Sequence, residues 1–350
     1  MRIIDKYLCK EYLRLYFIFI FFFSATFLLT DLFQSINILV KQASSFLLVK
    51  YYLLQVPYLF ALLSPLASIV SVLFIVSYLT ETYQIQALQV SGTSIKRTVL
   101  PLLIIGIVIS FSLFFFNETL TFKANQISQK IKEESFLKIT PKKVQRNIFI
   151  QVPPHYLLYI RLFYPEKKKM EDIIIYKISS PSSLIICKES KWTGKEWVFF
   201  KGTEYILKEE WEETFFDKKI LPLNKKPAYF VKKYFPFEKM NASELKRYIY
   251  EYRESGFDTR DMETEFYSKI SYPFANFILL FLGIPLALFL RKGGKGASFA
   301  LGLIVSFGYY EITALSKSMG EGGTLTPFLA AWIPNILFLT GGIYLFTKRE

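Results

Sequence analysis

Histidine and cysteine are nearly missing from this sequence. Its 350 residues include one histidine, His155, and two cysteines, Cys9 and Cys187. Zinc sites in proteins are built from several ligands of these two types. A catalytic pair of cysteine and histidine needs both residues in one site. The composition therefore predicts no metal site of this kind and no cysteine protease chemistry.

The motifs of common nucleotide-binding and hydrolytic enzymes are missing too. Gly194-Lys195 and Gly294-Lys295 lack the upstream glycine and the following Ser or Thr of a phosphate-binding loop. The sequence contains no metalloprotease helix motif and no glycine-flanked nucleophilic serine. We therefore expect a protein that is not an enzyme and that binds no cofactor of its own.

Long apolar segments are what the sequence has in abundance. Hydrophobic residues make up 52% of it, with 36 Phe and 23 Tyr, the composition of a polytopic α-helical membrane protein. Six segments are long enough to cross a bilayer, which takes about 20 apolar residues: 15–40, 51–79, 99–116, 270–290, 297–315 and 327–346. The first resembles a signal peptide in its basic start, but it is too long and no small-residue cleavage site follows it.

A polar stretch, residues 118–268, separates the first three spans from the last three. Short β-branched and aromatic runs within it alternate with Pro, Gly, Ser and Lys clusters, the pattern of an all-β sandwich or roll. A helical return follows from about residue 243. We therefore expect three parts: residues 1–117 with a loop at 80–97, an inserted β domain with its helical return at 118–268, and residues 269–350.

Lysine and arginine in the short loops predict the orientation. One side collects the N-terminus, Lys96, Arg97, Arg291, Lys292, Lys295, Lys348 and Arg349, and the other side collects Lys41, Lys50 and Lys317. The side rich in basic residues is cytoplasmic in membrane proteins. Both termini are then cytoplasmic and the β domain lies outside, so Cys9 and Cys187 cannot form a disulfide. We attribute the net charge of +14 to basic residues that set the topology and attract anionic lipid, rather than to binding of nucleic acid.

Several polar or small residues within the spans suggest function. Asp31 and Glu311 are carboxylates in or near apolar helices, where ionised groups are costly and mark functional sites, unless each lies close enough to an interface to stay hydrated. Ser298, Gly302 and Ser306 recur at every fourth position, which permits close helix contact. That contact is either within the subunit or with a partner.

The loop at 80–97 has its own short helical pattern. Ile85 and Leu88 lie on one face, Gly92 stands where a helix ends in left-handed geometry, and Ser94 is placed to cap the next span. The alternative is an ordinary turn between two helices that contacts no other protein.

Several strings in this order resemble the LptF/LptG permease family of the lipopolysaccharide export transporter. They are residues 87–94 (ALQVSGTS), Asn117-Glu118, residues 265–273 (EFYSKISYP) with 283–285 (GIP), and residues 332–335 (WIPN). The resemblance covers nearly the whole chain and includes the order of three spans, a β domain and three spans.

The resemblance implies a subunit in the inner membrane that pairs with a paralogous permease, or with itself, around a central cavity. A separate cytoplasmic ABC ATPase dimer would bind ATP and drive it. The substrate would be lipopolysaccharide, which a jelly-roll β domain passes to a periplasmic bridge protein of similar fold. In this reading the span with Ser298, Gly302 and Ser306 meets the partner at a lateral gate.

The resemblance also suggests site residues. The ATPase would contact the loop at 80–97, with Ile85 and Leu88 filling an apolar groove. Many family members carry an acid where this chain has Gln84, and the nearest acid here is Glu81. Lys41, with Asp31 and Glu311, is the candidate for the substrate cavity.

Two other classes of function are weighed against a transport subunit. A mechanotransmission or scaffold protein would drive an external domain without moving lipid. A membrane-anchored enzyme would need a polar constellation in the insert, and the sequence shows none. Bound glycolipid and a co-purifying ATPase would separate the three.

Overall fold

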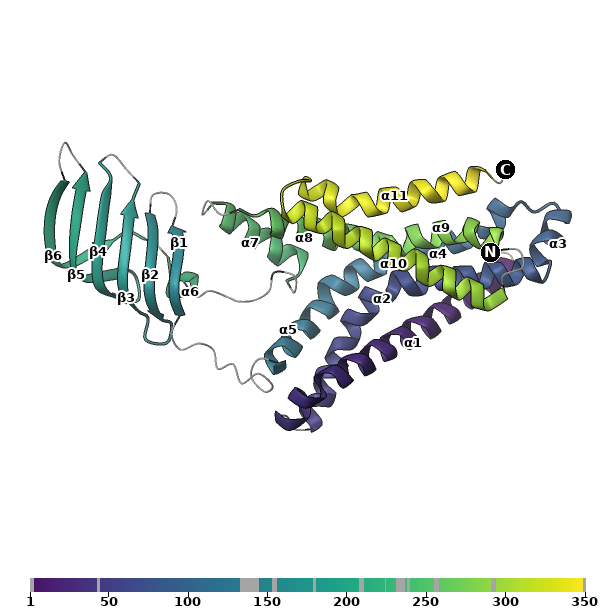
Figure 1. The fold of residues 1–350 in the computed structure, drawn as a ribbon, viewed down its shortest axis with the longest axis horizontal. Helices are drawn as coiled ribbons and strands as arrows, with labels where there is room; N and C mark the ends of the chain where they lie inside the picture. The colour runs from purple at the N-terminus through teal and green to yellow at the C-terminus, as the bar shows by residue number, and fades with distance from the viewer. Residues whose placement is uncertain are drawn as a thin grey trace. The chain divides into compact units, whose positions relative to one another are not determined.

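The structure of this chain is a computed structural model that describes residues 3–42, 45–132, 145–152, 156–178, 181–207, 211–223, 225–230, 237, 240–254, 258–290 and 294–348. It divides into two compact units. The membrane unit comprises Met1–Leu137, Phe237–Arg247 and Arg260–Glu350, and the sheet unit comprises Lys138–Pro236 and Tyr248–Thr259. Figure 1 shows the helices of the first unit and the strands of the second.

Six helical stretches among the described residues are long and apolar enough to cross a membrane. They are built from α1 (Ile3–Gln42), α2 (Ser45–Glu81), α4 (Ile95–Phe116) with η1 (Asn117–Thr121) and α5 (Phe122–Ile131), α8 (Arg260–Ser271) with η4 (Tyr272–Phe274) and α9 (Ala275–Phe289), α10 (Gly294–Glu321) and α11 (Pro327–Thr347). The short helix α3 (Gln84–Val90) lies at the same end of this bundle as both chain termini (Figure 1). We call it the α3 end. The polytopic helical class predicted from the sequence is confirmed.

The helices extend further than hydropathy predicts. The third span continues without a break from Ile95 to Ile131, 37 residues, because polar residues beyond Phe116 keep the helical hydrogen bonds through one π-helical turn. At about 1.5 Å per residue it is roughly 55 Å long and exceeds the hydrocarbon core of about 30 Å. The fourth span begins at Arg260, so the residues on both flanks of the expected insert belong to the membrane unit.

Helix α2 is the centre of the membrane unit. Most of its apolar span is buried, and Ile69, Val70, Val72 and Leu73 are fully inaccessible. Pro65 has no N–H, so the carbonyl of Ala61 lacks its helical partner. At the next residue, Leu62, the hydroxyls of Tyr272 and Tyr310 both donate to the backbone carbonyl, at 2.6 and 2.9 Å. These bonds tie the region before Pro65 to α10 and to the start of the fourth span.

Glycines let two helices approach α2 closely. A Cβ at Gly283 of α9 would lie 2.5 Å from Val72 Cγ1, and one at Gly302 of α10 would lie 2.7 Å from Val70 Cγ2. Ser298 sits on the same face of α10, and its hydroxyl donates to Ser77 Oγ at 3.0 Å. In lipid no hydrophobic driving force holds helices together. Small residues at such contacts let the helices pack closely instead.

These contacts correct the partner-facing interpretation of the stripe. Ser298, Gly302 and Ser306 are all buried, and the contacts of the first two are with α2 of the same chain. The stripe therefore serves packing within the subunit, the alternative that the sequence left open. Helical spacing shows that three residues share a face, but not which neighbour that face meets.

The sheet unit contains six strands, β1 (Gln145–Val152), β2 (Tyr156–Tyr164), β3 (Lys169–Lys177), β4 (Ser183–Trp192), β5 (Trp197–Leu207) and β6 (Trp211–Leu221). Each pairs antiparallel with the next in one sheet of order β1-β2-β3-β4-β5-β6. The predicted inserted β domain is confirmed. Its described strands follow one another as a meander, without the crossover of a Greek-key jelly roll or the second sheet of a sandwich.

One face of the sheet is apolar and buried, but its side-chain alternation shifts by one residue midway along the strands. On β2 the buried positions are Leu158 and Ile160, then Phe163. The shift runs across the sheet through Asp172 and Lys201, whose φ angles of 50° and 51° are left-handed. A left-handed residue breaks the two-residue alternation of a strand, so apolar side chains on either side of the break share the buried face.

Helices α6 (Pro227–Phe230) and α7 (Ala242–Glu254) complete the return from the sheet. Phe230 is buried against Trp197 and Phe163, and the indole of Trp197 donates to the carbonyl of Lys225 at 2.9 Å. Glu118 of η1 accepts a hydrogen bond from the backbone of Ala242, the first residue of α7, at 2.8 Å. A carboxylate at a helix N-terminus satisfies a free N–H and the helix dipole.

Gly302→Leu is expected to destabilise the membrane unit by about 1–3 kcal/mol, because the added side chain overlaps Val70 and forces α10 from α2. Gly308→Leu on the same helix is the control, since nothing lies within 4 Å of a Cβ there. Thermal unfolding of the purified chain in detergent measures both. Equal melting temperatures for the two variants would contradict the packing assigned to Gly302.

Candidate functional site

Helix α3 is held as a defined projection between α2 and α4. Tyr83 before it has φ 57°, and Gly92 after it has φ 83°, so the chain turns sharply at both ends. The backbone of Thr93 donates to Leu88 and that of Gly92 to Gln89, at 2.9 and 3.0 Å. These two bonds form a Schellman motif, which places the αL residue directly after the helix cap. The predicted role of Gly92 is confirmed.

Ser94 then starts α4 as predicted. Its hydroxyl accepts the backbone N–H of Arg97 at 3.3 Å, and its carbonyl accepts the N–H of Thr98 at 3.1 Å. The turn between α3 and α4 is thus closed by hydrogen bonds on both sides of Gly92. The short turn between α3 and α4 is therefore held by hydrogen bonds of its own backbone and of the Ser94 cap.

The side chains of α3 do not all point outward. Ile85 is buried in the core of the membrane unit and cannot fill a groove on another protein, which corrects the prediction for this residue. Leu88 is half-buried. The exposed apolar residues are Val90, 90% accessible, and Tyr83, 73% accessible. A helical period shows which residues lie together, but the packed side is decided by the helices around it.

The two polar candidates beside α3 are placed differently. Glu81 is the last residue of α2 and Gln84 the first residue of α3, and both are half-buried. A cavity of about 360 Å³ lies next to the end of α3, lined by Gln89, Ser94, Ile95, Pro285, Leu288 and Phe346, with Lys96 among them. The α3 end therefore offers a helical projection beside an apolar recess.

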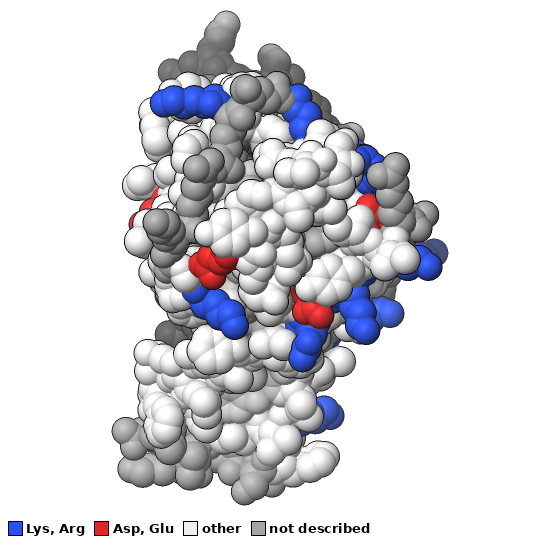
Figure 2. All heavy atoms as spheres, turned by 90° about the vertical axis from the view of Figure 1, so that its right-hand side faces the viewer, with Lys and Arg blue, Asp and Glu red and all other residues white. Residues whose placement is uncertain are grey.

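Basic residues predominate among the charged side chains at this end. Figure 2 views the molecule from the side on which α3 lies in Figure 1, and shows more Lys and Arg than Asp and Glu around an otherwise uncharged surface. Lys6, Lys10 and Arg14 of α1 are among the exposed or half-exposed basic residues. This is the charge pattern expected of a membrane face that meets anionic lipid headgroups.

Asp31 lies near the other end of α1, beside Tyr51 and Tyr52 of α2. The carboxylate is half-buried and neighbours polar hydroxyls, so it does not face hydrocarbon alone. The side chain of Lys41, the third candidate for a cavity, lies outside the part of the chain that the structure describes. Its proposed role stays a prediction.

Glu311 is exposed on α10 among exposed apolar side chains. Ile304 is 68%, Phe307 62% and Leu315 64% accessible on the same helix. A carboxylate on such a face is costly if it meets lipid, and it is tolerated where a partner or water covers it. No described contact joins Glu311 to Asp31, so the structure does not bring the two into one site.

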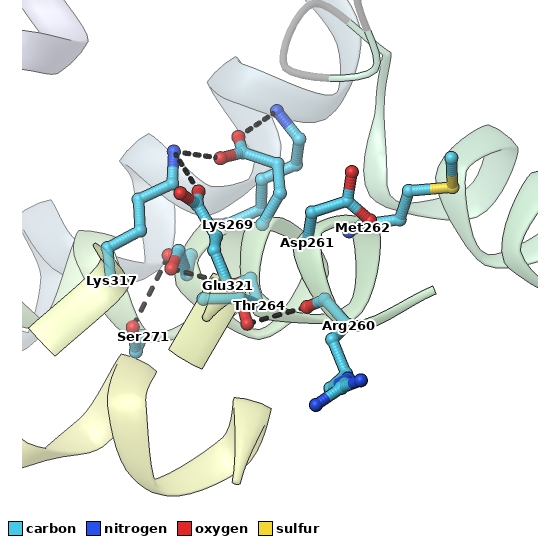
Figure 3. A network of polar contacts seen from close by, with 10 residues as sticks. Arg260, Asp261, Met262, Thr264, Lys269, Ser271, Lys317 and Glu321 are labelled. Atoms are coloured by element: carbon cyan, nitrogen blue, oxygen red, sulfur yellow. Dashed lines mark hydrogen bonds and ion pairs between the residues drawn. The ribbon is translucent and has the colours of Figure 1, made fainter. Parts of the chain in front are cut away.

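An ionic cluster between α8 and α10 was not foreseen from the sequence. Glu265 is 8% accessible, and its two carboxylate oxygens accept from Lys317 Nζ at 2.6 Å and Lys269 Nζ at 2.9 Å. Figure 3 shows Lys317 and Lys269 joined by dashed lines to one carboxylate, and Lys317 also joined to Glu321, which an ion pair of 3.9 Å connects to it. Lys269 lies one helical turn after Glu265, which is a signal in the sequence, but Lys317 comes from a distant span.

A second ion pair lies at the α3 end. Arg97 Nη1 and Nη2 donate to Asp5 Oδ1 and Oδ2 at 3.3 and 3.1 Å, a fork-like contact, and Asp5 is 4% accessible. The sequence held one signal for it, an isolated acid in a basic N-terminus predicted to share a side with Arg97. Among the described residues, no group of His, Cys, Asp and Glu could hold a metal ion.

With this geometry in view, the chain can be compared with known families. The family described as lipopolysaccharide export system permease LptF/LptG matches residues 6–348. The chain belongs to this family. The match includes every membrane span, the α3 turn and the sheet unit. A search of the curated proteins finds no match.

Membership in LptF/LptG gives the α3 turn and the spans a common context. Members of this family are permeases of lipopolysaccharide export rather than enzymes. A permease moves its membrane helices relative to one another. The side-chain contacts that join different helices are therefore the ones of interest. Asp5–Arg97 and Glu265–Lys317 are two such contacts, each between helices distant in sequence.

Glu265→Gln is expected to destabilise this LptF/LptG-family chain by about 3 kcal/mol, because it removes a negative charge from between two partly buried lysines. Glu321→Gln is the matched control: its contact with Lys317 is 3.9 Å and its side chain is 39% exposed, so a change under about 1 kcal/mol is expected. Thermal unfolding in detergent compares them. A larger loss for Glu321→Gln would refute this ranking.

Proposed function

We propose that this chain is the permease subunit of an ABC transporter that extracts lipopolysaccharide from the inner membrane. A separate cytoplasmic ATPase dimer binds ATP and drives it, while a second permease chain, a paralogue or another copy, completes the cavity. The sheet unit passes the lipid to a periplasmic bridge protein. The observation that carries this proposal is the family match over residues 6–348 together with a rigidly capped helix, α3, that projects between two spans.

The α3 turn is the proposed contact with the ATPase. Val90 on α3 and Tyr83 just before it are exposed apolar side chains beside an apolar recess. Exposed apolar side chains on a short helix can bind in an apolar groove of a partner protein. The caps at Gly92 and Ser94 connect that contact stiffly to α4. Both features support a coupling element better than an ordinary turn.

The proposed orientation places the α3 end and both termini in the cytoplasm and the sheet unit in the periplasm. The excess of basic side chains at the α3 end supports it. Within the sheet unit, the continuous buried apolar face of the strands suits a domain that handles acyl chains. Asp31 and Glu311, with Lys41, remain the proposed polar residues of the lipid path.

A pull-down of the ATPase tests the coupling role of α3. Val90→Asp places a charge on a surface residue and is expected to release the ATPase, because an unpaired charge is costly in an apolar groove. Leu88→Asp should have the same effect, while Gln84→Glu should keep or strengthen binding by restoring the acid that many family members carry.

Ile178→Asp is the matched control for Val90→Asp, because Ile178 is an exposed apolar residue of the sheet unit, 44% accessible. The ATPase should be recovered with it in full. Membrane levels of every variant are measured alongside. Full recovery with both Val90→Asp and Leu88→Asp would remove α3 from the proposed mechanism. Absence of bound lipopolysaccharide, by mass spectrometry of the wild-type complex, would favour the mechanotransmission alternative.

Labelling in intact cells tests the orientation. The native Cys187 cannot report it, because burial raises the pKa of its thiol to about 12 and its side chain is 2% accessible. We therefore expect an impermeant maleimide to label Lys195→Cys, an exposed position next to Gly194 in the sheet unit, in intact cells. Lys10→Cys, an exposed position on α1, should be labelled only after permeabilisation. Labelling of Lys10→Cys in intact cells would reverse the topology.

A further inference from the structure

We propose that Asp5 and Arg97 form the joint through which movement of the α3 turn is passed to α1, and that α1 is the span that this movement tilts. The inference rests on the proposed function, in which an ATPase moves α3. It assigns positioning roles to two residues that contact neither ATP nor lipid.

The first step concerns Arg97, which is fixed at two points. Its backbone N–H donates to the hydroxyl of the Ser94 cap at 3.3 Å, and Ser94 follows the hydrogen-bonded turn at Gly92 by two residues. Its guanidinium holds both oxygens of Asp5. A forked contact between arginine and carboxylate fixes orientation as well as distance. Arg97 therefore joins the end of α3 and the start of α1 through one residue.

The second step concerns Asp5, which is not a surface ion. Its side chain is 6% exposed, while that of Arg97 is 40% exposed. A buried carboxylate that loses such a partner is strongly disfavoured, so the contact persists when one helix moves. One turn further along α1, the thiol of Cys9 lies 3.8 Å from the carbonyl of Pro101 in α4. The two helices are thus joined over their first turns.

The third step concerns how α1 is held along its length. Its buried residues form one stripe that ends at Ser24: Asp5, Leu8, Tyr12, Tyr16, Ile20 and Ser24. Tyr12 shares a hydrogen bond with Ser68 of α2 at 2.8 Å, and Tyr16 shares one with Ser64 of α2. From residue 25 to residue 34 no described side chain is buried. Helix α1 is thus fastened by buried side chains as far as Ser24, and its described side chains from residue 25 to residue 34 are exposed or half-buried.

These three features together describe a lever. The joint at Asp5 lies at one end, the tyrosine–serine contacts with α2 lie in the middle, and Asp31 lies beyond the buried stripe, beside Tyr51 and Tyr52 of α2. From Asp5 to Asp31 an α-helix covers about 39 Å at 1.5 Å per residue. Of the six candidate spans α1 is the least buried, so it meets the least resistance from its own chain when it tilts. A small displacement of the joint becomes a larger one near Asp31.

The experiment uses the complete complex, reconstituted with its ATPase and lipopolysaccharide, and measures lipid released per ATP hydrolysed by assembled complexes. Asp5→Asn keeps the shape of the side chain but removes its charge. We expect it to lower this ratio about five- to ten-fold, the low end of typical couplings between sites. Asp5→Arg combined with Arg97→Asp restores the pair in reverse and should recover most of the ratio.

Glu11→Gln is the control. Glu11 lies on the same helix and forms an exposed pair with Arg14 at 3.7 Å, so its loss should leave the ratio unchanged. A wild-type complex that hydrolyses ATP without moving lipid would contradict the proposed function itself. A working wild type with an unchanged ratio in Asp5→Asn would overturn the inference alone. A lower yield of complexes with an unchanged ratio would show that the pair serves folding, which also overturns it.

A measurement on the native pair covers the case in which Asp5→Asn does not assemble. Spin labels at Lys96→Cys, next to Arg97, and at Lys10→Cys, both exposed positions, are introduced with Cys9→Ser. If the joint holds, their separation stays the same with and without trapped ATP, while the separation of labels at Leu29→Cys and Ile304→Cys changes. A change in the first distance, or none in the second, would refute the joint.

Discussion

The close approach of α9 and α10 to α2 is the constraint on which the membrane unit depends. Two glycines, Gly283 and Gly302, stand where a methyl group would overlap valines of α2. Because lipid is as apolar as the helix surfaces, burial alone does not hold these helices together, and close packing must do so. With α2 in the centre, α9 and α10 become a rigid block, and other spans are attached to it.

Hydrogen bonds add specificity to this block. Ser64 and Ser68 of α2 donate to the side chain and backbone of Asn276 in α9, at 2.5 and 3.0 Å, and the same serines meet tyrosines of α1. Tyr309 of α10 donates to Asn335 of α11 at 2.8 Å. A polar group in hydrocarbon needs a partner, so each bond favours one arrangement of helices. Helix α1 joins this network through Tyr12 and Tyr16, both in its first part.

The fold thus contains stiff and yielding parts in a definite order. The α3 turn is closed by caps, α4 continues as one long helix through Ile131, and the Glu265 cluster ties α8 to α10. Between these parts, α1 is attached through one stripe of buried residues that ends at Ser24. A permease needs both properties, since its core must transmit force while some span moves relative to the rest.

Much of this architecture follows from the sequence alone, because the signals are local. Apolar runs predict the spans, alternating β-branched runs predict the strands, and Gly92 and Ser94 predict the end of α3 and the start of α4, since backbone conformation and capping depend on neighbouring residues. Family strings along the chain predict the kind of permease.

What only the tertiary structure decided is the direction in which side chains face and the partners they find. The period that groups Ile85 with Leu88 does not reveal that Ile85 packs inside, and the spacing of Ser298, Gly302 and Ser306 does not name α2 as their neighbour. The partners Asp5 and Arg97 are 92 residues apart, and Lys317 lies 52 residues from Glu265. Such contacts arise from the three-dimensional packing of whole helices, and no local rule of spacing, propensity or capping extends that far along the chain.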